Sequence, residues 1–502
     1  MSENNSQKTE TPRQAPVKVR IAPSPTGDPH IGTAYVAVFN YMFAQKHGGH
    51  FVVRIEDTDQ QRYRADSEAA ILKSLRWLGL SWHEGPDIPP GQIPGAKWNG
   101  PYRQSERLHI YKEYAAKLVE TGHAYPCFCT PERLQELRKK QQESKEAAES
   151  GYDGHCRDIA PHEARARVAQ NERHTIRLKM PHTGQTVVED QLRGTICFEN
   201  SMVDDQVLMK SDGFPTYHLA VVVDDHLMGI THVIRGEEWI TSTPKHVQLY
   251  ESFGWPKPVY MHLPLLRNAD KSKISKRKNP TNILYYKRKG ILPEALVNFL
   301  ALLGYHPEGD KEKYSLAELC ASFDASRIHL GGPVFDFEKL AWLNGLYLRE
   351  LSAEDFLKRL RSELLSDDYL LKVVPLLQER IDTLDQFFAR GDFFFGGDLD
   401  LTHVELVPKK ADPKLVQTGL EKLLDQFDSD TAWTLASVEA CFTKVMAENG
   451  LKPKDLLMPA RLAVTGRKDS PPLYETVQVL GKEIVRRRLR TAVTLLAAQN
   501  QP

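Results

Sequence analysis

Residues 20–33 read Arg20-Ile-Ala-Pro-Ser-Pro-Thr-Gly-Asp-Pro-His-Ile-Gly-Thr33 and join a predicted strand to a predicted helix. Before them, from Val17 to Ile21, apolar residues alternate with basic ones, which is typical of a strand. After them, apolar residues recur at helical spacing from Ile31 to Phe43, and Gly48-Gly49 ends the run. Such a turn directs free backbone N–H groups and the positive end of the helix dipole at one place. It therefore predicts an anion-binding turn, although a purely structural connection has the same form.

His30 stands at the first turn of that helix. At this position an imidazole is commonly a solvated or capping residue. It becomes a candidate ligand if a second phosphate-binding element exists elsewhere in the chain.

The composition bounds the classes of protein that this chain can belong to. At 502 residues it is expected to form several domains, and its zero net charge gives no global attraction to nucleic acid. Six cysteines do not make a disulfide scaffold, and no apolar run approaches the roughly 18 residues that a membrane span needs. We expect a cytoplasmic protein with no membrane or DNA partner, preceded by a disordered tail at residues 1–16.

A second strand–loop–helix unit follows directly. Phe51–Ile55 is strand-like, Glu56 opens the loop, and Ile71–Leu78 carries a helical apolar stripe. Two such units predict a parallel sheet with helices packed on it, with ligands bound beyond the carboxyl ends of the strands. Arg20 ends the first strand and Glu56 follows the second, so both are expected at one crevice, where they could also simply form a salt bridge.

The middle of the chain breaks and then resumes this pattern. Residues 101–211 combine a helix at Leu108–Val119 with short strand-like pieces, which predicts an inserted domain. The apolar run Tyr217–Val223 and the segment Val233–Arg235 are then interpreted as buried strands, and Thr243-Pro244 is expected to open a helix.

Residues 271–290 are the most basic segment, with eight Lys or Arg and no acid. Beyond about 290 the pattern is helical almost throughout. The predicted fold is α/β: a Rossmann-type parallel-sheet domain with an inserted α+β domain, followed by a mostly α-helical C-terminal half. The expected boundaries are 17–100 and 212–262 for the sheet domain, 101–211 for the insert, 263–345 for a stem-contact domain, and 346–502 for the helical region.

Two short motifs carry a family resemblance. His30-Ile-Gly-Thr33 resembles the HIGH motif of class I aminoacyl-tRNA synthetases, and Lys273-Ile-Ser-Lys-Arg277, here called the KISKR loop, resembles their KMSKS loop. The pair in this order is far more specific than either motif alone. The surrounding sequence is similar to bacterial glutamyl-tRNA synthetases, closely from about 17 to 345 and loosely beyond, in Arg20–Gly27, Arg54–Asp59, Asp212–His218 and Val233–Glu238.

The resemblance implies ATP-dependent ligation of L-glutamate to tRNA(Glu) through a glutamyl-adenylate, with Mg²⁺ accompanying ATP. Such chemistry needs positioning and charge stabilisation rather than a protein nucleophile. The implied catalytic residues are His30, Lys273 and Lys276. The implied ATP-binding residues are His30, Gly32, Glu238 and Lys276.

The resemblance also implies the glutamate-binding residues. Arg20 and Arg235 are assigned to the side-chain carboxylate and Glu56 to the α-ammonium, with Ser24 and Tyr217 beside them. Two guanidinium groups would favour glutamate over neutral glutamine. This chain has Val221 where the family often has Asn, so a polar contact of the family is absent from that position.

Some members of the family bind zinc in the insert, and Cys127, Cys129 and Cys156 lie at similar positions. Zinc prefers four ligands in structural sites. The alternative is three reduced thiols in a domain that folds without metal. The fourth ligand stays open among three candidates, Tyr152, His155 and Asp158.

The resemblance assigns anticodon binding to residues 346–502, with Arg380 expected against the third anticodon base. A monomer is expected because no long apolar heptad pattern occurs. Three alternative functions remain: a catalytically silent tRNA-binding relative, a paralogue that glutamylates a modified tRNA base, and another nucleotidyltransferase. The paralogue lacks the helical C-terminal half that this chain has.

Overall fold

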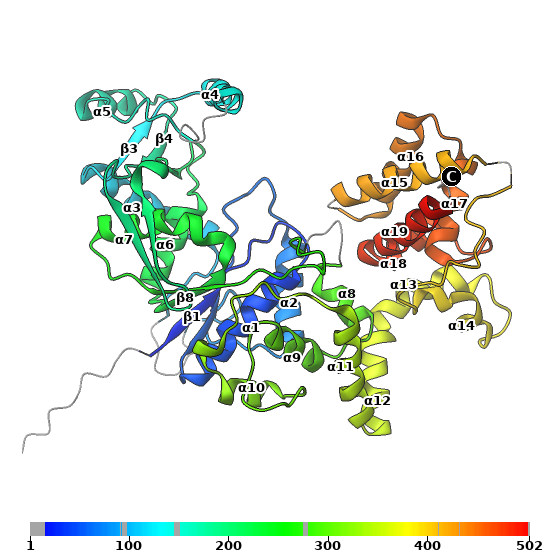
Figure 1. Ribbon diagram of the computed structural model, residues 1–502. Helices are drawn as coiled ribbons and strands as arrows, with labels where there is room; N and C mark the ends of the chain where they lie inside the picture. Colours follow the sequence, from blue (N-terminus) through cyan, green and yellow to red (C-terminus); the bar gives the residue numbers. More distant parts are fainter. Residues whose placement is uncertain are drawn as a thin grey trace, which may run out of the picture. The chain divides into compact units, whose positions relative to one another are not determined.

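The computed structural model in Figure 1 describes residues 16–90, 92, 98–144, 151–274, 280–409, 411–430 and 432–499. These residues form two compact units. Unit 1 comprises residues up to Thr26, Thr33–Leu265 and Leu300–Pro333, and unit 2 comprises Gly27–Gly32, Leu266–Phe299 and the chain from Val334 onward. The predicted tail, apart from residue 16, and Lys276 of the KISKR loop lie outside the described residues.

The two predicted strand–helix units at the start of unit 1 are confirmed. Strand β1 (Lys18–Ile21) pairs in parallel with β2 (His50–Val53), and helices α1 (Ile31–Lys46) and α2 (Ala65–Trp77) follow them. Buried Asn40 of α1 donates to the carbonyl of Val36 and, at 3.1 Å, to that of Ile234, which fastens the helix to β8.

A four-stranded sheet lies next to β1 and has the order β6-β5-β9-β8. Strand β8 (His232–Gly236) runs parallel to β9 (Val259–Leu263), as predicted for a Rossmann-type domain. The hairpin β5 (Gln185–Asp190) and β6 (Gly194–Glu199) completes this sheet, because β5 pairs with β9. The second half of the predicted insert therefore contributes strands to the sheet of the Rossmann-type domain.

The rest of the insert has its own antiparallel sheet, β3-β4-β7. Figure 1 shows β3 and β4 with the insert helices around them. A core that includes Tyr111, Leu118 and Leu178 joins this sheet to α6. The elements of the insert are α3 (Leu108–Glu120), β3 (Ala124–Cys127), α4 (Pro131–Ser144), α5 (Pro161–Ala169), β4 (Thr175–Leu178) and β7 (Val207–Met209).

One prediction is wrong: Tyr217–Val223, interpreted as a buried strand, is the first part of helix α6 (Tyr217–Leu227). A short apolar run is compatible with either structure when it is buried on all sides. The helix continues through Asp224 and Asp225, whose side chains are almost fully buried in ion pairs. The run of three valines therefore reflects burial and not a strand.

The predicted helix at Thr243-Pro244 is confirmed, and the helical prediction beyond residue 290 also holds. In unit 2, helices α15 to α19 pack together at the C-terminal end (Figure 1). Arg488 stabilises this packing from inside, because its guanidinium donates to the carbonyls of Phe393 at 2.8 Å and Gly397 at 3.0 Å. The remaining helices are α7 (Thr243–Phe253), α8 (Ile283–Arg288), α9 (Pro293–Gly304), α10 (Leu316–Ser322), α11 (Phe337–Glu350), α12 (Ala353–Arg359), α13 (Asp367–Gln378), α14 (Gln386–Gly391), α15 (Pro413–Ser429), α16 (Leu435–Asn449), α17 (Pro453–Thr465), α18 (Leu473–Leu480) and α19 (Lys482–Gln499).

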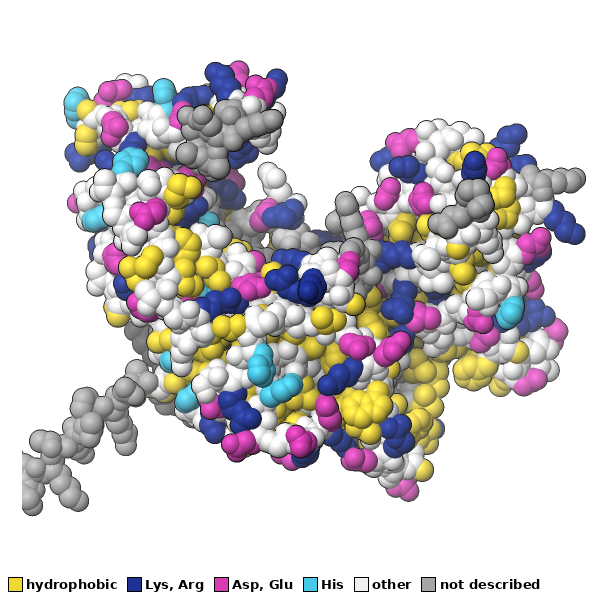
Figure 2. Space-filling view, viewed as in Figure 1, with side chains coloured by type: hydrophobic (Ala, Val, Ile, Leu, Met, Phe, Trp, Pro, Cys, Tyr) yellow, Lys and Arg dark blue, Asp and Glu magenta, His cyan; other side chains and the backbone are white. Residues whose placement is uncertain are grey.

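The surface agrees with the zero net charge of the sequence. On the face drawn in Figure 2, basic and acidic side chains are interspersed over both units. Within the described part of the chain, none of the helices has the length and apolar character required to traverse a bilayer.

Candidate active site

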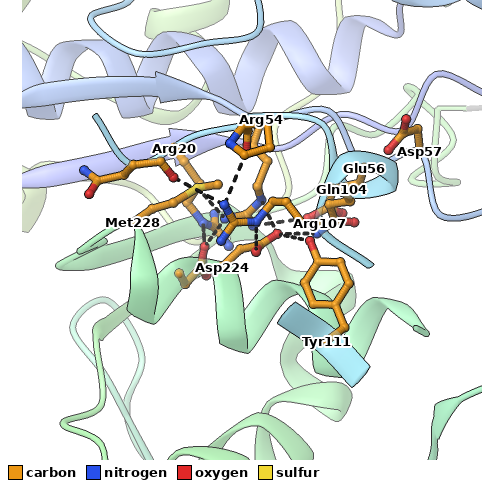
Figure 3. A network of polar contacts seen from close by, with 12 residues as sticks. Arg20, Arg54, Glu56, Asp57, Gln104, Arg107, Tyr111, Asp224 and Met228 are labelled. Atoms are coloured by element: carbon orange, nitrogen blue, oxygen red, sulfur yellow. Dashed lines mark hydrogen bonds and ion pairs between the residues drawn. The ribbon is translucent and has the colours of Figure 1, made fainter. Parts of the chain in front are cut away.

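A buried network of charged side chains lies at the carboxyl ends of β1 and β2 in unit 1 (Figure 3). The carboxylate of Asp225 accepts from Arg20 Nε at 3.1 and 3.2 Å and from Arg54 Nη1 at 2.7 Å. Arg54 also donates to Glu56 at 3.2 Å. Arg20 and Glu56 therefore share one crevice, as predicted, but they do not form the salt bridge with each other that was considered as an alternative.

The neighbouring carboxylate, Asp224, extends this network toward the insert. It accepts from Arg107 Nε at 2.7 Å, from the Tyr111 hydroxyl at 2.8 Å and from Gln104 at 3.0 Å. The network thus balances three arginines, Arg20, Arg54 and Arg107, against three carboxylates. Since an unpaired buried charge is very costly, the network holds α6 rigidly over the strand ends.

Glu56 and Asp225 differ in how easily the charge of the carboxylate is removed. Burial raises the pKa of Glu56 to about 7, although Arg54 and Arg20 lower it. Asp225 is the opposite case, because Arg20 and Arg54 outweigh its burial and hold its pKa below the usual range. Glu56 can therefore change its protonation state near neutral pH while Asp225 stays ionised.

Arg235, near the end of β8, has a different environment from Arg20. It donates to the Tyr217 hydroxyl at 3.1 Å and to Thr243 Oγ1 at 2.9 Å, and it contacts two imidazoles, of His246 and His262. Among the described residues, no carboxylate lies within ion-pair distance of it. Arg235 is thus a buried cation whose charge the described protein leaves uncompensated.

Tyr217 connects the two arginines of the predicted glutamate pocket. Burial raises the pKa of its hydroxyl, Arg235 and Arg20 lower it, and Glu56 and Asp225 raise it further, so all four charges act on this one group. Ser24 is exposed, and its carbonyl accepts from the amide of Thr26 at 2.9 Å. Val221, one turn beyond Tyr217 on α6, is buried in the apolar core.

The predicted ATP-binding residues His30 and Gly32 lie in unit 2. His30 Nδ1 accepts from the amide of Gly32 at 3.0 Å, so the imidazole caps α1. A Cβ at position 32 would stand 3.0 Å from that Nδ1, and glycine avoids this close contact. Residues 29–31 also pair with 281–283: the amide of Ile31 donates to the Thr281 carbonyl at 2.7 Å. The helix start therefore lies beside the segment that follows the KISKR loop.

The residues just before the KISKR loop are held by a polar turn. The side chain of Asn268 donates to Ser272 Oγ at 2.9 Å and to the Lys273 carbonyl at 3.3 Å. Lys273 itself is exposed, as a residue that reaches for a ligand must be.

The second half of the basic stretch has a structural role. Lys289 pairs with Asp398 at 2.9 Å, Lys287 with Glu363 at 3.4 Å, and Arg288 donates to the Val479 carbonyl at 3.0 Å. These basic residues fasten α8 to the helical part of unit 2.

Glu238, the remaining predicted ATP-binding residue, lies in unit 1, immediately after β8. Its side chain is folded over Gly236, where a Cβ would stand 2.0 Å from the Glu238 carboxylate. Only glycine allows this arrangement, which keeps the exposed carboxylate at the end of the strand.

The three cysteines of the insert converge. The sulfurs of Cys127, Cys129 and Cys156 all lie within 4.8 Å of one another, and the Tyr152 hydroxyl lies 3.3 Å from the first and 3.5 Å from the second. The contact with Cys156 and that with Tyr152 lower the pKa of Cys127 to about 4. Of the three candidates for a fourth ligand, Tyr152 has its polar atom at the sulfurs. His155 and Asp158 are exposed and are not members of this cluster of described ligand atoms.

Arg380 lies at a pocket in unit 2 of about 270 Å³. Asp469 in this pocket contacts Arg380 at 3.7 Å and Arg390 at 3.4 Å. The lining residues are Leu377, Arg380, Arg390, Arg467, Asp469, Ser470 and Pro471. Three arginines and one carboxylate thus line this space together with Leu377, Ser470 and Pro471.

Comparison with known proteins agrees with this arrangement. The model of the class I tRNA synthetases for glutamate and glutamine, catalytic domain, matches residues 16–342, and an anticodon binding domain matches residues 352–493. The chain belongs to the class I aminoacyl-tRNA synthetases.

Within that class, the chain is a member of the glutamate–tRNA ligase family. It is 47% identical to the glutamate–tRNA ligase of Stutzerimonas stutzeri over 485 residues, which are 97% of each chain. It is 48% identical to that of Pseudomonas aeruginosa PAO1, covering 97% of this chain and 96% of the relative. The solved glutamate–tRNA ligase from Elizabethkingia meningosepticum, in complex with its amino acid, is 33% identical with a TM-score of 0.63, covering 96% of this chain and all of that one. The family and fold class predicted from the sequence are confirmed.

Sequence reasoning missed the residues that surround the predicted pocket. Asp224, Asp225, His246 and His262 were not singled out, although the adjacent acids after Val223 are an informative signal. Two carboxylates that directly follow an apolar run must pair with cations if the run is buried.

The network predicts that Asp225→Asn destabilises unit 1. The substitution leaves Arg20 and Arg54 buried without this counter-charge, which typically costs about 3–5 kcal/mol. The matched control is Asp212→Asn, because the Asp212 side chain is 56% exposed and pairs with Lys210 at the surface. That pair contributes at most about 1 kcal/mol. Urea unfolding of both variants checks the difference, and equal midpoints would show that the buried charges are not coupled to folding.

Proposed function

We propose that this chain catalyses the ATP-dependent ligation of L-glutamate to tRNA(Glu) through a glutamyl-adenylate. Membership of the glutamate–tRNA ligase family supports the reaction. The observation that carries the choice of amino acid is Arg235, a buried guanidinium without a carboxylate partner among the described residues. A substrate that brings its own carboxylate completes this site, whereas an amide leaves the charge unmatched.

The remaining glutamate-binding roles follow from charge. Arg20 and Tyr217 help Arg235 to bind the side-chain carboxylate, and ionised Glu56 binds the α-ammonium. The position of Ser24 on the loop after β1 suits a backbone or hydroxyl contact to the amino acid. Because Asp225 already balances Arg20, Arg235 provides most of the preference for an anionic side chain.

ATP binding is assigned to His30, Gly32, Glu238, Lys273 and Lys276. The positive end of the α1 dipole favours phosphate, and the lysines of the KISKR loop supply positive charge to the phosphoryl oxygens. Mg²⁺ accompanies ATP and is held mainly by its phosphates. The adenylate forms when the α-carboxylate of glutamate attacks the α-phosphorus and pyrophosphate leaves.

For the tRNA, we assign the third anticodon base to Arg380 and its pocket. Unstacked bases are commonly recognised by stacking and by hydrogen bonds to their edges, and this pocket provides guanidinium groups for both. All six cysteines are free thiols, which fits a cytoplasmic enzyme. We expect the enzyme to act as a monomer.

We further propose that Cys127, Cys129, Cys156 and Tyr152 hold one Zn²⁺. Three sulfurs and one hydroxyl lie close together. Their number, four, is the number of ligands that a structural zinc site uses. Zinc there would stabilise the insert and would take no part in the ligation chemistry.

The reaction is tested by ATP–pyrophosphate exchange with glutamate or glutamine, each with and without tRNA. Exchange is expected with glutamate when tRNA is present, and it should be at least about 100-fold weaker with glutamine. Arg235→Met should raise the KM for glutamate by a similar factor, whereas Arg76→Met, at an exposed position, should not. Absence of exchange in all four mixtures would contradict the proposed reaction.

Glu56 predicts the pH dependence of glutamate binding. The pKa of Glu56, about 7, lies above the ordinary value of 4.5. Protonation of Glu56 therefore contributes to the free energy of unfolding in full below pH 4.5, and this contribution is lost as the pH rises through 7. Only the ionised form binds the ammonium. Below about pH 7, kcat/KM for glutamate should therefore fall up to about tenfold per pH unit. In Glu56→Gln this acid limb should disappear while KM rises, and its persistence would assign the limb to another group.

Metal analysis tests the zinc site. Protein purified without chelator should contain one equivalent of zinc, and Tyr152→Phe should lose it to a chelator faster than the wild type. His155→Ala is the control, because its side chain is exposed outside the sulfur cluster. Zinc present only in traces in the wild type would reject the site.

A further inference from the structure

A chain of buried and half-buried hydrogen bonds runs through Arg235 and connects five residues on five elements of unit 1. Asp190 at the end of β5 lies 2.6 Å from His262 Nδ1 on β9, and His262 Nε2 lies 3.1 Å from Arg235 Nε on β8. On the other side, Arg235 Nη1 lies 3.2 Å from His246 Nδ1 on α7. His246 Nε2 lies 3.0 Å from His218 Nδ1 on α6. We call these five residues the Arg235 relay.

The donor-only arginine at its centre fixes every proton of the relay. A guanidinium has only N–H groups, so both nitrogens that face Arg235 must be acceptors. His262 therefore carries its proton on Nδ1 and donates it to Asp190. His246 carries its proton on Nε2 and donates it to His218. Both imidazoles that contact Arg235 are then neutral.

The surroundings keep these imidazoles neutral. Burial lowers the pKa of His246 well below its usual value, and the charge of Arg235 lowers it further. Burial also lowers the pKa of His262, although Asp190 raises it. For His218, burial with the charges of Lys245 and Arg235 lowers the pKa to about 4 against the opposing effect of Asp204.

The relay supports Arg235 without placing a carboxylate in direct contact with it. Its four hydrogen-bond partners, Tyr217, Thr243, His246 and His262, are all neutral, and its exposed fraction is 5%. Arg20 is fixed by the carboxylate of Asp225 instead. A carboxylate in place of either imidazole would orient Arg235 equally well. That carboxylate would also neutralise the positive charge of Arg235 from within the protein, so the charge would no longer be available to the carboxylate of the substrate.

We propose that His246 and His262 are positioning residues that orient Arg235 while leaving its charge available to the side-chain carboxylate of the amino acid. This inference rests on the proposed function, because it assigns Arg235 to that carboxylate. The relay is thereby a determinant of specificity, since it keeps an uncompensated cation in a buried site and penalises an uncharged amino acid.

The test compares His246→Asp with His246→Asn. The two side chains have nearly the same shape, and both place an acceptor near the position of Nδ1, but only Asp adds a charge. His246→Asp should raise the KM for glutamate on the order of 100-fold. The KM for ATP and kcat at saturating glutamate should change by no more than about threefold. The ratio of kcat/KM for glutamate to that for glutamine should fall by a similar factor of about 100.

His246→Asn should raise the KM for glutamate by about tenfold or less, because the acceptor is kept without a charge. Equal KM values for the two variants, or a loss of kcat with unchanged KM in both, would reduce the relay to a buried structural cluster and overturn the proposal. Thermal unfolding of both variants shows whether they fold. If His246→Asp does not fold, His262→Glu against His262→Gln makes the same comparison at Nε2.

The failure of the relay and the failure of the proposed function give different results. If the wild type shows no exchange with glutamate, the function itself is wrong and Arg235 has no such ligand. If the wild type is active but the acidic and amide variants behave alike, the function stands and the relay proposal is rejected.

Discussion

The carboxylate of Asp225 is the interaction on which the catalytic unit depends. It is shared by Arg20 of β1 and by Arg54, which directly follows β2, and it projects from α6. One buried charge therefore joins the ends of two strands to a helix. Buried ions are tolerated only when they are paired. Removing the Asp225 carboxylate would therefore leave both arginines buried without this counter-charge, so the three ions stabilise the fold together. The same helix begins with Tyr217, and the network therefore also sets the position of this residue of the predicted amino-acid pocket.

Arg20 and Arg235 show how two arginines in one pocket can differ in electrostatic role. The first is paired with a carboxylate and contributes shape and hydrogen-bond donors. The second is held by neutral groups and contributes charge. The partners of each arginine therefore decide its electrostatic role in the predicted pocket. An arginine that is already paired with a carboxylate attracts a substrate anion less strongly than an arginine whose partners are neutral.

In the helical unit, basic residues serve mainly to hold the fold together. Arg288 is half-buried and donates to the carbonyl of Val479 near the end of α18. Arg488 is buried and donates to the carbonyl of Gly397, while Lys289 pairs with Asp398. A count of lysines and arginines along the sequence therefore overstates the surface available to RNA. The pocket around Arg380 combines exposed arginines with an exposed carboxylate, which leaves their donors accessible.

The sequence by itself determined the two strand–helix units, the turn at residues 20–33 between the first strand and its helix, the family, and the set of cysteines, because these depend on local patterns and short motifs. It did not determine that Tyr217–Val223 is helical, since a fully buried apolar run has no distinguishing period. Only the tertiary structure decided the partners of the pocket residues. Asp225 is 205 residues from Arg20, and His246 and His262 come from other elements. Such long-range pairings follow from how the sheet and helices pack, and no local pattern encodes them.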